Sequence, residues 1–348
     1  VGEGDVMLDK SVRDAMPSNG FFPAYVRYAR AQTDAPDIFH LGTALAMFSA
    51  VAARGSRMAI PLPGARRKDG KTHTVTPLHL WVLLVGPSGA RKSTAIQIGS
   101  RIMWYEPPMR VEKSPEATFN RWSKESGNGT LGCHGLLCYP EASVLFDIVR
   151  KPWWALAEGF LCNVYDGLTM KRLLVGKATT KDGKRTYGPP IEIKIEGPRI
   201  AFLGGISPAL LSVRHHDRVS GLLGRMMMLY GDRERLDVFP PLRREDEEQR
   251  LGRMFRKYAL RQRTVDMKPE SWAKFVAWAK ALDRESGNYA PDKRAMMTRL
   301  PQHVLRVAAL YRLSIPDDDG TVADVIDRAL ALGELAKGAI LRLPKMEK

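Results

Sequence analysis

The most constraining feature of the sequence is an apolar run that leads directly into a glycine-rich stretch ending in Lys-Ser. Residues 80–85 read Leu-Trp-Val-Leu-Leu-Val, which is typical of a strand buried on both faces. The next residues, before a helical pattern begins, are Gly86, Pro87, Ser88, Gly89, Ala90, Arg91, Lys92, Ser93 and Thr94. A strand, a glycine-rich turn and a helix start form a phosphate-binding loop, whose backbone N–H groups face the phosphates. The pattern therefore predicts an α/β fold with a phosphate site at the end of a core strand.

Within this loop we expect Lys92 to reach the β- and γ-phosphate oxygens and the Ser93 hydroxyl to coordinate Mg²⁺. The motif G-x-x-x-x-G-K-[ST] has its second glycine where this chain has Arg91. Arginine adopts the backbone angles of that glycine only with strain, so we expect either a slightly reshaped loop or a reduced nucleotide affinity. The alternative is an ordinary surface loop, which the flanking strand and helix patterns disfavour.

Composition narrows the choice of partner. The chain has 348 residues, 44% of them hydrophobic, which is enough for one large or two ordinary domains. Lys and Arg number 54 against 38 Asp and Glu, a net charge of +16. Such a positive field favours polyanions such as nucleic acid, although a general solubility role is the plainer alternative.

The cysteines and histidines give no metal or disulfide pattern. The three cysteines have no repeated C-x-x-C spacing, which disfavours a disulfide framework and a zinc site and indicates a reducing compartment. His134 and the pair His215-His216 lack thiolate or carboxylate partners at ligand spacing. Without a leader or a membrane-length apolar run, we expect a soluble cytoplasmic protein with no membrane partner.

Periodicity divides the chain into three predicted parts. Residues 1–60 form a helical N-terminal segment, residues 61–239 a nucleotide-binding core, and residues 240–348 a helical C-terminal domain. The last part opens with a charge-rich run at 243–250 and continues in three amphipathic helical patterns.

Two hairpins with basic tips are predicted inside the core. The first spans Pro61 to Thr76 around an Asp69-Gly70 turn. Its basic tip residues are Arg66, Arg67, Lys68 and Lys71. The second runs from Leu173 to Ile195 around Asp182-Gly183. Its tip residues Lys181, Lys184 and Arg185 suit a phosphate backbone, so we expect them to contact nucleic acid.

Two further core strands end in polar residues. The run 136–139 leads through Pro140 to Glu141, where P-loop ATPases place an acid that orients the attacking water. The alternative for Glu141 is an acid at the N-terminus of the next helix. The run 199–206 ends at Ser207, which is either a sensor of the γ-phosphate or a helix N-cap before Pro208. These alternatives stay open on sequence alone.

Arg225 stands at the edge of the apolar run Met226 to Tyr230. An arginine in that place can reach the γ-phosphate held by a neighbouring subunit and supply transition-state charge. The alternative is an ordinary surface arginine.

The order of these motifs resembles a primase-associated family of P-loop ATPases encoded by phages and mobile elements and described as replicative helicases. The resemblance covers most of the chain. It rests on Phe22-Pro23 and the helical segment ending at Ser49, Leu80 to Ser93, Glu141, Tyr165-Asp166-Gly167, Leu203 to Pro208, Gly221 to Arg225, and Arg299 to His303 with Arg306 and Ala308.

The resemblance implies a three-layer P-loop NTPase core of the AAA+ or RecA kind. It implies that residues 86–94 bind ATP, that Glu141 activates water and that Arg225 acts in trans. Three departures, namely Arg91 for glycine, Pro140 for aspartate and Ser207 where glutamine is usual, argue against fast hydrolysis but not against the fold.

The sequence thus leads to two functional hypotheses. The first is a ring-forming, hexameric, ATP-dependent DNA motor of the replicative-helicase type, with the basic hairpin lining a central channel and a primase or replication-initiation partner. In it Ser207 and Arg225 sense the γ-phosphate. The second is an ATP-dependent DNA-binding or assembly switch that hydrolyses ATP slowly. A small-molecule kinase is disfavoured because no acceptor base is evident.

Overall fold

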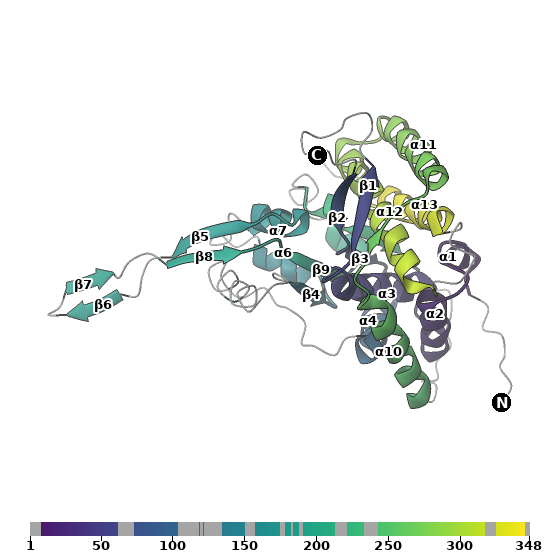
Figure 1. The fold of residues 1–348 in the computed structure, drawn as a ribbon, viewed down its shortest axis with the longest axis horizontal. Coiled ribbons are helices and arrows are strands. Elements are labelled where there is room, and N and C mark those ends of the chain that lie inside the picture. The colour runs from purple at the N-terminus through teal and green to yellow at the C-terminus, as the bar shows by residue number, and fades with distance from the viewer. Residues whose placement is uncertain are drawn as a thin grey trace.

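A four-stranded parallel sheet lies at the centre of the protein (Figure 1). The computed structural model describes residues 8–61, 73–103, 134–149, 157–174, 178–181, 184–187, 191–212, 221–232, 243–316 and 325–344, together with Thr118 and Arg121. The sheet order is β10-β3-β9-β4. Its strands are β3 (Trp81–Val85), β4 (His134–Tyr139), β9 (Arg199–Ile206) and β10 (Met227–Tyr230). The predicted α/β class is confirmed, and the strand predicted before the glycine-rich loop is β3.

Helices cover one face of the sheet. All residues of α3 (Asp37–Ala52) are buried, and a Cβ atom on Gly42 would lie 3.2 Å or closer to Val82, Leu84 and Leu229, so α3 crosses β3 and β10 closely. Outside α3 lie α2 (Phe21–Gln32), α4 (Lys92–Met103) and α10 (Glu245–Ala259). The Phe255 ring of α10 lies 5.6 Å from that of Phe21. Helices predicted to belong to the two ends of the chain therefore share one core with the sheet.

On the opposite face, α7 (Ala157–Asp166) contacts β9 and α13 (Val325–Leu341) contacts β10, while α12 (Pro291–Ser314) packs against α13 and also against α2, α3 and α10. Successive residues of a strand point to opposite faces, so Trp81 faces away from α3. Its ring packs 5.3 Å from that of Tyr165 on α7. The result is three layers, with apolar strands buried between two helical layers. The helix α11 (Pro269–Ser286) packs outside α12 and α13.

Short elements connect these layers. They are α1 (Lys10–Asp14), α6 (Ser143–Val149), α8 (Pro208–Ser212) and the 3₁₀ turn η2 (Leu223–Arg225). Within the described part of the chain, no helix is both long enough and apolar enough to cross a bilayer.

The first predicted hairpin is present, but its first strand begins at Arg57 rather than Pro61, so residues 57–60 are a strand and not part of the predicted helical segment. The strand β1 (Arg57–Pro61) pairs antiparallel with β2 (His73–Pro77), and β11 (Thr264–Val265) adds a parallel edge to β1. The basic tip predicted at 66–71 lies outside the described residues.

The second predicted hairpin is confirmed as an arm that projects from the body of the protein (Figure 1). At its base β5 (Met170–Leu174) pairs antiparallel with β8 (Ile191–Ile195). Farther out β6 (Ala178–Lys181) pairs with β7 (Lys184–Tyr187), with Lys181 opposite Lys184. The turn residues Asp182 and Gly183 lie outside the described residues. The strands β5 through β8 together form the basic arm.

Candidate functional site

The glycine-rich loop joins the carboxyl end of β3 to the start of α4, as predicted. A Cβ atom on Gly86 would lie 2.4 Å from the carbonyl oxygen of Gly231, so only glycine lets the loop pass this close to the end of β10. Gly89 has a φ of 84°, in the left-handed region that favours glycine. The two glycines therefore set the path of the loop.

Lys92 folds back onto the loop that precedes it. Its Nζ atom donates to the carbonyl oxygens of Gly86 and Pro87, each at 2.8 Å. Burial lowers the pKa of Lys92, and the nearby Glu141 carboxylate opposes that shift. An ammonium bonded to two neutral carbonyls can exchange them for phosphate oxygens, which form stronger, charge-assisted bonds.

Arg91 adopts the backbone conformation of the glycine that it replaces. Its φ is 61°, and it is the only residue other than glycine with a positive φ in the described part of the chain. Its Nε atom lies 3.2 Å from Oδ1 of Asp34, in the connection between α2 and α3. The backbone strain expected for an arginine at this position is therefore present, and its two expected consequences, a reshaped loop or a reduced nucleotide affinity, stay predictions.

Substitutions at Arg91 should separate its backbone strain from its ion pair. Arg91→Ala keeps the strained angle and takes a partner from the buried Asp34 carboxylate, so we expect the free energy of unfolding to fall by about 1–3 kcal/mol. Arg91→Gly loses the pair but relieves about 1 kcal/mol of strain, while making the unfolded chain more flexible. Urea denaturation should therefore place the Gly variant between the Ala variant and the parent. A Gly variant less stable than the Ala variant would contradict this account.

Glu141 is brought next to the loop by β4 and β9. Gly205 of β9 lies between the two: a Cβ atom there would be 2.7 Å from the Pro140 carbonyl oxygen and 3.2 Å from Cβ of Lys92. Glu141 is exposed, and its Oε1 accepts a 3.0 Å hydrogen bond from the Ser143 hydroxyl at the start of α6. The carboxylate is thus close to a helix start and also on the same sheet edge as Lys92, which is compatible with both predicted roles.

The other predicted loop-side residues lie on the same edge. Ser207 follows the last residue of β9, and its carbonyl oxygen accepts from the Leu210 backbone N–H as α8 begins. Ser93 is exposed in the first turn of α4. An exposed hydroxyl beside a phosphate loop fits Mg²⁺, which needs few protein ligands when phosphate oxygens and water supply the rest. Among the residues described, no group of three or more His, Cys, Asp or Glu side chains could hold a metal by itself.

Arg225 lies at the opposite edge of the sheet. Met227 is paired with Val82 near the start of parallel strands, so Arg225 is level with the amino end of β3, whereas the loop follows its carboxyl end. Arg225 is level with Leu80, and five residue steps of about 3.3 Å each, or about 17 Å, separate Leu80 from Val85 at the start of the loop. Arg225 is therefore too far from the loop of its own chain to contact a phosphate there.

Arg225 is not an ordinary surface arginine. Its side chain is 11% exposed, and one guanidinium nitrogen lies 2.6 Å from Oδ2 of Asp166. A second nitrogen donates to the Gly221 carbonyl oxygen at 3.0 Å. Although burial alone would lower it, the pKa of Arg225 is raised because of the hydrogen bond to Asp166.

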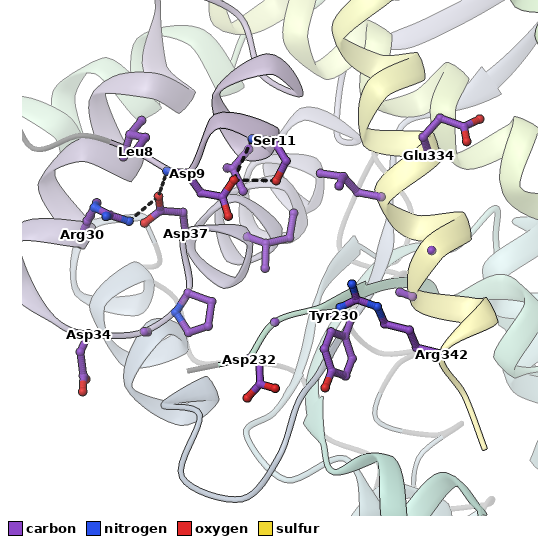
Figure 2. Close-up of a pocket in the computed structure, with 18 residues that line it drawn as sticks. Leu8, Asp9, Ser11, Arg30, Asp34, Asp37, Tyr230, Asp232, Glu334 and Arg342 are labelled. Carbon is purple, nitrogen blue, oxygen red and sulfur yellow. Dashed lines mark hydrogen bonds and ion pairs between the residues drawn. The ribbon is translucent and has the colours of Figure 1, made fainter. Parts of the chain in front are cut away.

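A pocket of about 600 Å³ lies at the carboxyl end of β10, between the connection that precedes α3 and the end of α13 (Figure 2). Two contacts join the glycine-rich loop to residues that line this pocket. Arg91 of the loop pairs with Asp34, and Gly86 of the loop lies against Gly231. On one wall the guanidinium of Arg342, the residue after α13, lies 4.8 Å from the ring centre of Tyr230 at the end of β10.

The other wall of the pocket is held by a buried carboxylate. Oδ2 of Asp37 accepts from the Asp9 backbone N–H at 2.7 Å and from Arg30 at 2.6 Å (Figure 2). Sequence reasoning missed this pocket because its residues come from three distant parts of the chain and form no local pattern.

The predicted nucleic-acid residues are placed far from the loop. Lys181 ends β6, and Lys184 and Arg185 begin β7, at the outer part of the basic arm (Figure 1). The structure thus brings together Lys92, Ser93, Glu141 and Ser207 at one sheet edge. It separates them from Arg225 and from the arm. No protein-family model matches the chain, and no curated protein matches its sequence.

Proposed function

We propose that the protein is a P-loop ATPase with a core of the AAA+ or RecA kind, acting as a ring-forming motor on DNA. The observation that carries the proposal is the meeting of Lys92, Ser93, Glu141 and Ser207 at the carboxyl edge of a parallel sheet, near a pocket whose lining residues Asp34 and Gly231 contact the loop. Ligands of open α/β sheets bind at this edge.

The size and lining of the pocket favour a nucleoside triphosphate over inorganic phosphate as the ligand. Its volume lies within the range of about 300–1,000 Å³ typical of small-molecule sites. Tyr230 offers an aromatic ring and Arg342 a planar cation, and both surfaces stack on nucleobases. A base in the pocket and phosphates in the loop would use the two halves of one continuous site.

Each residue at the edge then has a defined task in hydrolysis. Lys92 leaves the Gly86 and Pro87 carbonyls and neutralises charge on the β- and γ-phosphates. Glu141 accepts a proton from the attacking water, and Ser207 contacts the γ-phosphate through its hydroxyl. Mg²⁺ on Ser93 would supply further charge neutralisation.

The distance of Arg225 from its own loop supports catalysis between subunits. In a head-to-tail ring the amino edge of one sheet faces the carboxyl edge of the next. Arg225 would then enter the neighbouring site and add the charge that a lone P-loop lacks. A hexamer is the ring that we propose, with a primase or replication-initiation protein as partner.

The basic arm supports DNA, preferably single-stranded, as the track. We expect replacement of Lys181, Lys184 and Arg185 by alanine to reduce the slope of log K against log salt by about 2, since each phosphate contact on a single strand contributes about 0.7. The measurement is fluorescence anisotropy with a labelled oligonucleotide over a salt series. The matched control removes the same charge from exposed positions outside the arm: Arg253, Lys268 and Lys280 to alanine. An unchanged slope in the arm variant would refute the DNA-tracking role.

The slow switch remains the second candidate, and two observations favour it. Pro140 occupies the place where an aspartate would hold the magnesium shell, and a strained Arg91 stands in the loop. Steady-state ATP turnover with and without single-stranded DNA separates the two. Turnover that DNA stimulates severalfold supports the motor, whereas ATP-dependent assembly with negligible turnover supports the switch.

A further inference from the structure

Asp166 is shared by two arginines at the amino edge of the sheet. Its Oδ2 atom lies 2.6 Å from Arg225, and its Oδ1 atom lies 3.2 Å from Arg299 of α12. The three side chains are 29%, 11% and 32% exposed, so the cluster lies at the surface without being fully solvated. Because this partly buried carboxylate has two cationic partners, one arginine can move away while the other still neutralises Asp166.

The layer beneath Asp166 is fixed by buried contacts. The Tyr165 hydroxyl hydrogen-bonds Nδ1 of His303 at 3.2 Å, and Nε2 of His303 lies 3.3 Å from the Gly224 carbonyl oxygen. The Arg306 guanidinium lies 4.5 Å from the centre of the Tyr165 ring. The end of α7, the η2 turn and α12 are thereby joined below the surface. Above these fixed contacts, the ion pairs of Asp166 with its two arginines are the part of the cluster that can rearrange.

Asp166 is also the last residue of α7, the helix that leads into the basic arm. The strand β5 begins at Met170, and the intervening Gly167 has a φ of 69°. The returning strand β8 ends at Ile195 and is followed by Gly197, with a φ of 43°, whose N–H donates to the Thr169 hydroxyl at 3.3 Å. Both strands of the arm therefore meet the body at left-handed glycines next to Asp166. In Figure 1 the arm leaves the body beside α7.

We propose that Asp166 is a positioning residue that couples the trans arginine Arg225 to the basic arm. The inference rests on the proposed function and deepens it by naming how nucleotide and DNA communicate. In one state Asp166 holds Arg225 and Arg299 together. In the other, Arg225 has moved to the γ-phosphate of the neighbouring subunit and Arg299 alone keeps Asp166 paired.

Both the nucleotide and the DNA favour the state in which Arg225 has left Asp166. A γ-phosphate in the neighbouring site draws Arg225 away and frees the end of α7 to shift the root of the arm. DNA bound on the arm favours the shifted root and so releases Arg225 toward the phosphate. Coupling of this kind is reciprocal, so each ligand must change the affinity for the other by the same factor.

The test measures that factor in the assembled protein. The affinity for a labelled single-stranded oligonucleotide is determined with and without a non-hydrolysable ATP analogue, and the affinity for the analogue with and without oligonucleotide. We expect at least about a fivefold coupling in the parent and less than about twofold in Asp166→Asn. The affinity for the analogue without DNA should rise toward the value that the parent shows with DNA, because the amide holds Arg225 less firmly than the carboxylate does.

Two further variants keep the test decisive. Arg299→Gln removes the partner that would keep Asp166 paired after Arg225 leaves, so the coupling should fall here too, even if Asp166→Asn folds poorly. Glu192→Gln removes a carboxylate of the arm that pairs with Lys171 at 3.1 Å between exposed side chains, and should leave the coupling intact. A purely structural role for Asp166 would lower the melting temperature without changing the coupling factor.

The outcomes separate the inference from the proposed function. Parent-like coupling in both Asp166→Asn and Arg299→Gln overturns the inference while the ATPase proposal stands. A parent protein that binds neither the analogue nor DNA overturns both. Loss of coupling in these two variants, with Glu192→Gln unaffected, supports the positioning role.

Discussion

Lys92→Ala should lower the rate of ATP hydrolysis by about a hundredfold or more, the usual effect of removing one pre-organised charge from a reaction centre. In the structure the ammonium is held against the loop by the Gly86 and Pro87 carbonyls, already in place for a triphosphate. Alanine leaves those carbonyls without their donor and the phosphates without their cation. The measurements are ATP turnover, with and without single-stranded DNA, and calorimetry with Mg-ATP.

Lys280→Ala is the matched control, because Lys280 is an exposed lysine of α11 and its loss removes the same charge. Its turnover should equal that of the parent. Unchanged turnover in Lys92→Ala would remove the motor hypothesis. A parent protein with no affinity for Mg-ATP, alone or on an oligonucleotide, would remove the nucleotide site altogether.

The fold should become steeply less stable as the pH falls below 6.5, because of three buried histidines. His40, His79 and His303 are at most 1% exposed. Burial lowers the pKa of each from 6.5 to about 3, with a smaller contribution from Arg30 for His40 and from Arg306 for the other two. All three are neutral in the folded protein at pH values where the unfolded chain already binds protons. Their stabilisation is therefore complete above 6.5 and is lost progressively between 6.5 and 3.

Each such histidine costs about 1.4 kcal/mol of unfolding free energy per pH unit once the pH is well below 6.5. Three together cost about 4 kcal/mol per unit, against a typical total stability of about 5–15 kcal/mol. Urea unfolding between about pH 7 and about pH 5 measures the slope before most carboxylates titrate.

A single substitution tests the origin of this slope. Neither ring nitrogen of His40 has a hydrogen-bond partner among the residues that the structure describes. His40→Leu should therefore remove about a third of the slope and cost little stability at neutral pH. Unfolding free energy that stays constant down to about pH 5 would show that the histidines are protonated or reachable by water in the folded state.

The local part of the fold could be predicted because its signals are local. The buried run at 80–85 and the glycines after it predicted β3 and the loop, and the structure has both. Alternation around Asp182-Gly183 likewise predicted paired strands, which are β5 with β8 and β6 with β7. In each case propensity, periodicity and turn residues agree within about 20 consecutive residues.

The site as a three-dimensional arrangement could not be predicted in the same way. The sequence proposed Arg225 as a trans arginine but gave no sign that Asp166 pairs with it, since the two lie on different elements. Strain at Arg91 was expected from the missing glycine, yet the compensating Asp34 lies before α3. The pocket beside β10 combines residues near 34, 230 and 340, and such meetings depend on how the layers stack.

The fold also ties early segments to late ones, which has a consequence for biosynthesis. Tyr28 of α2 hydrogen-bonds Glu248 of α10 at 2.8 Å across 220 positions, and the Tyr311 hydroxyl reaches the Ala15 carbonyl oxygen at 2.6 Å across 296. A nascent chain emerging from the ribosome cannot close this core until α10 and α12 have been translated. Its apolar N-terminal helices stay exposed until then, so the protein should fold slowly and depend on chaperones during synthesis.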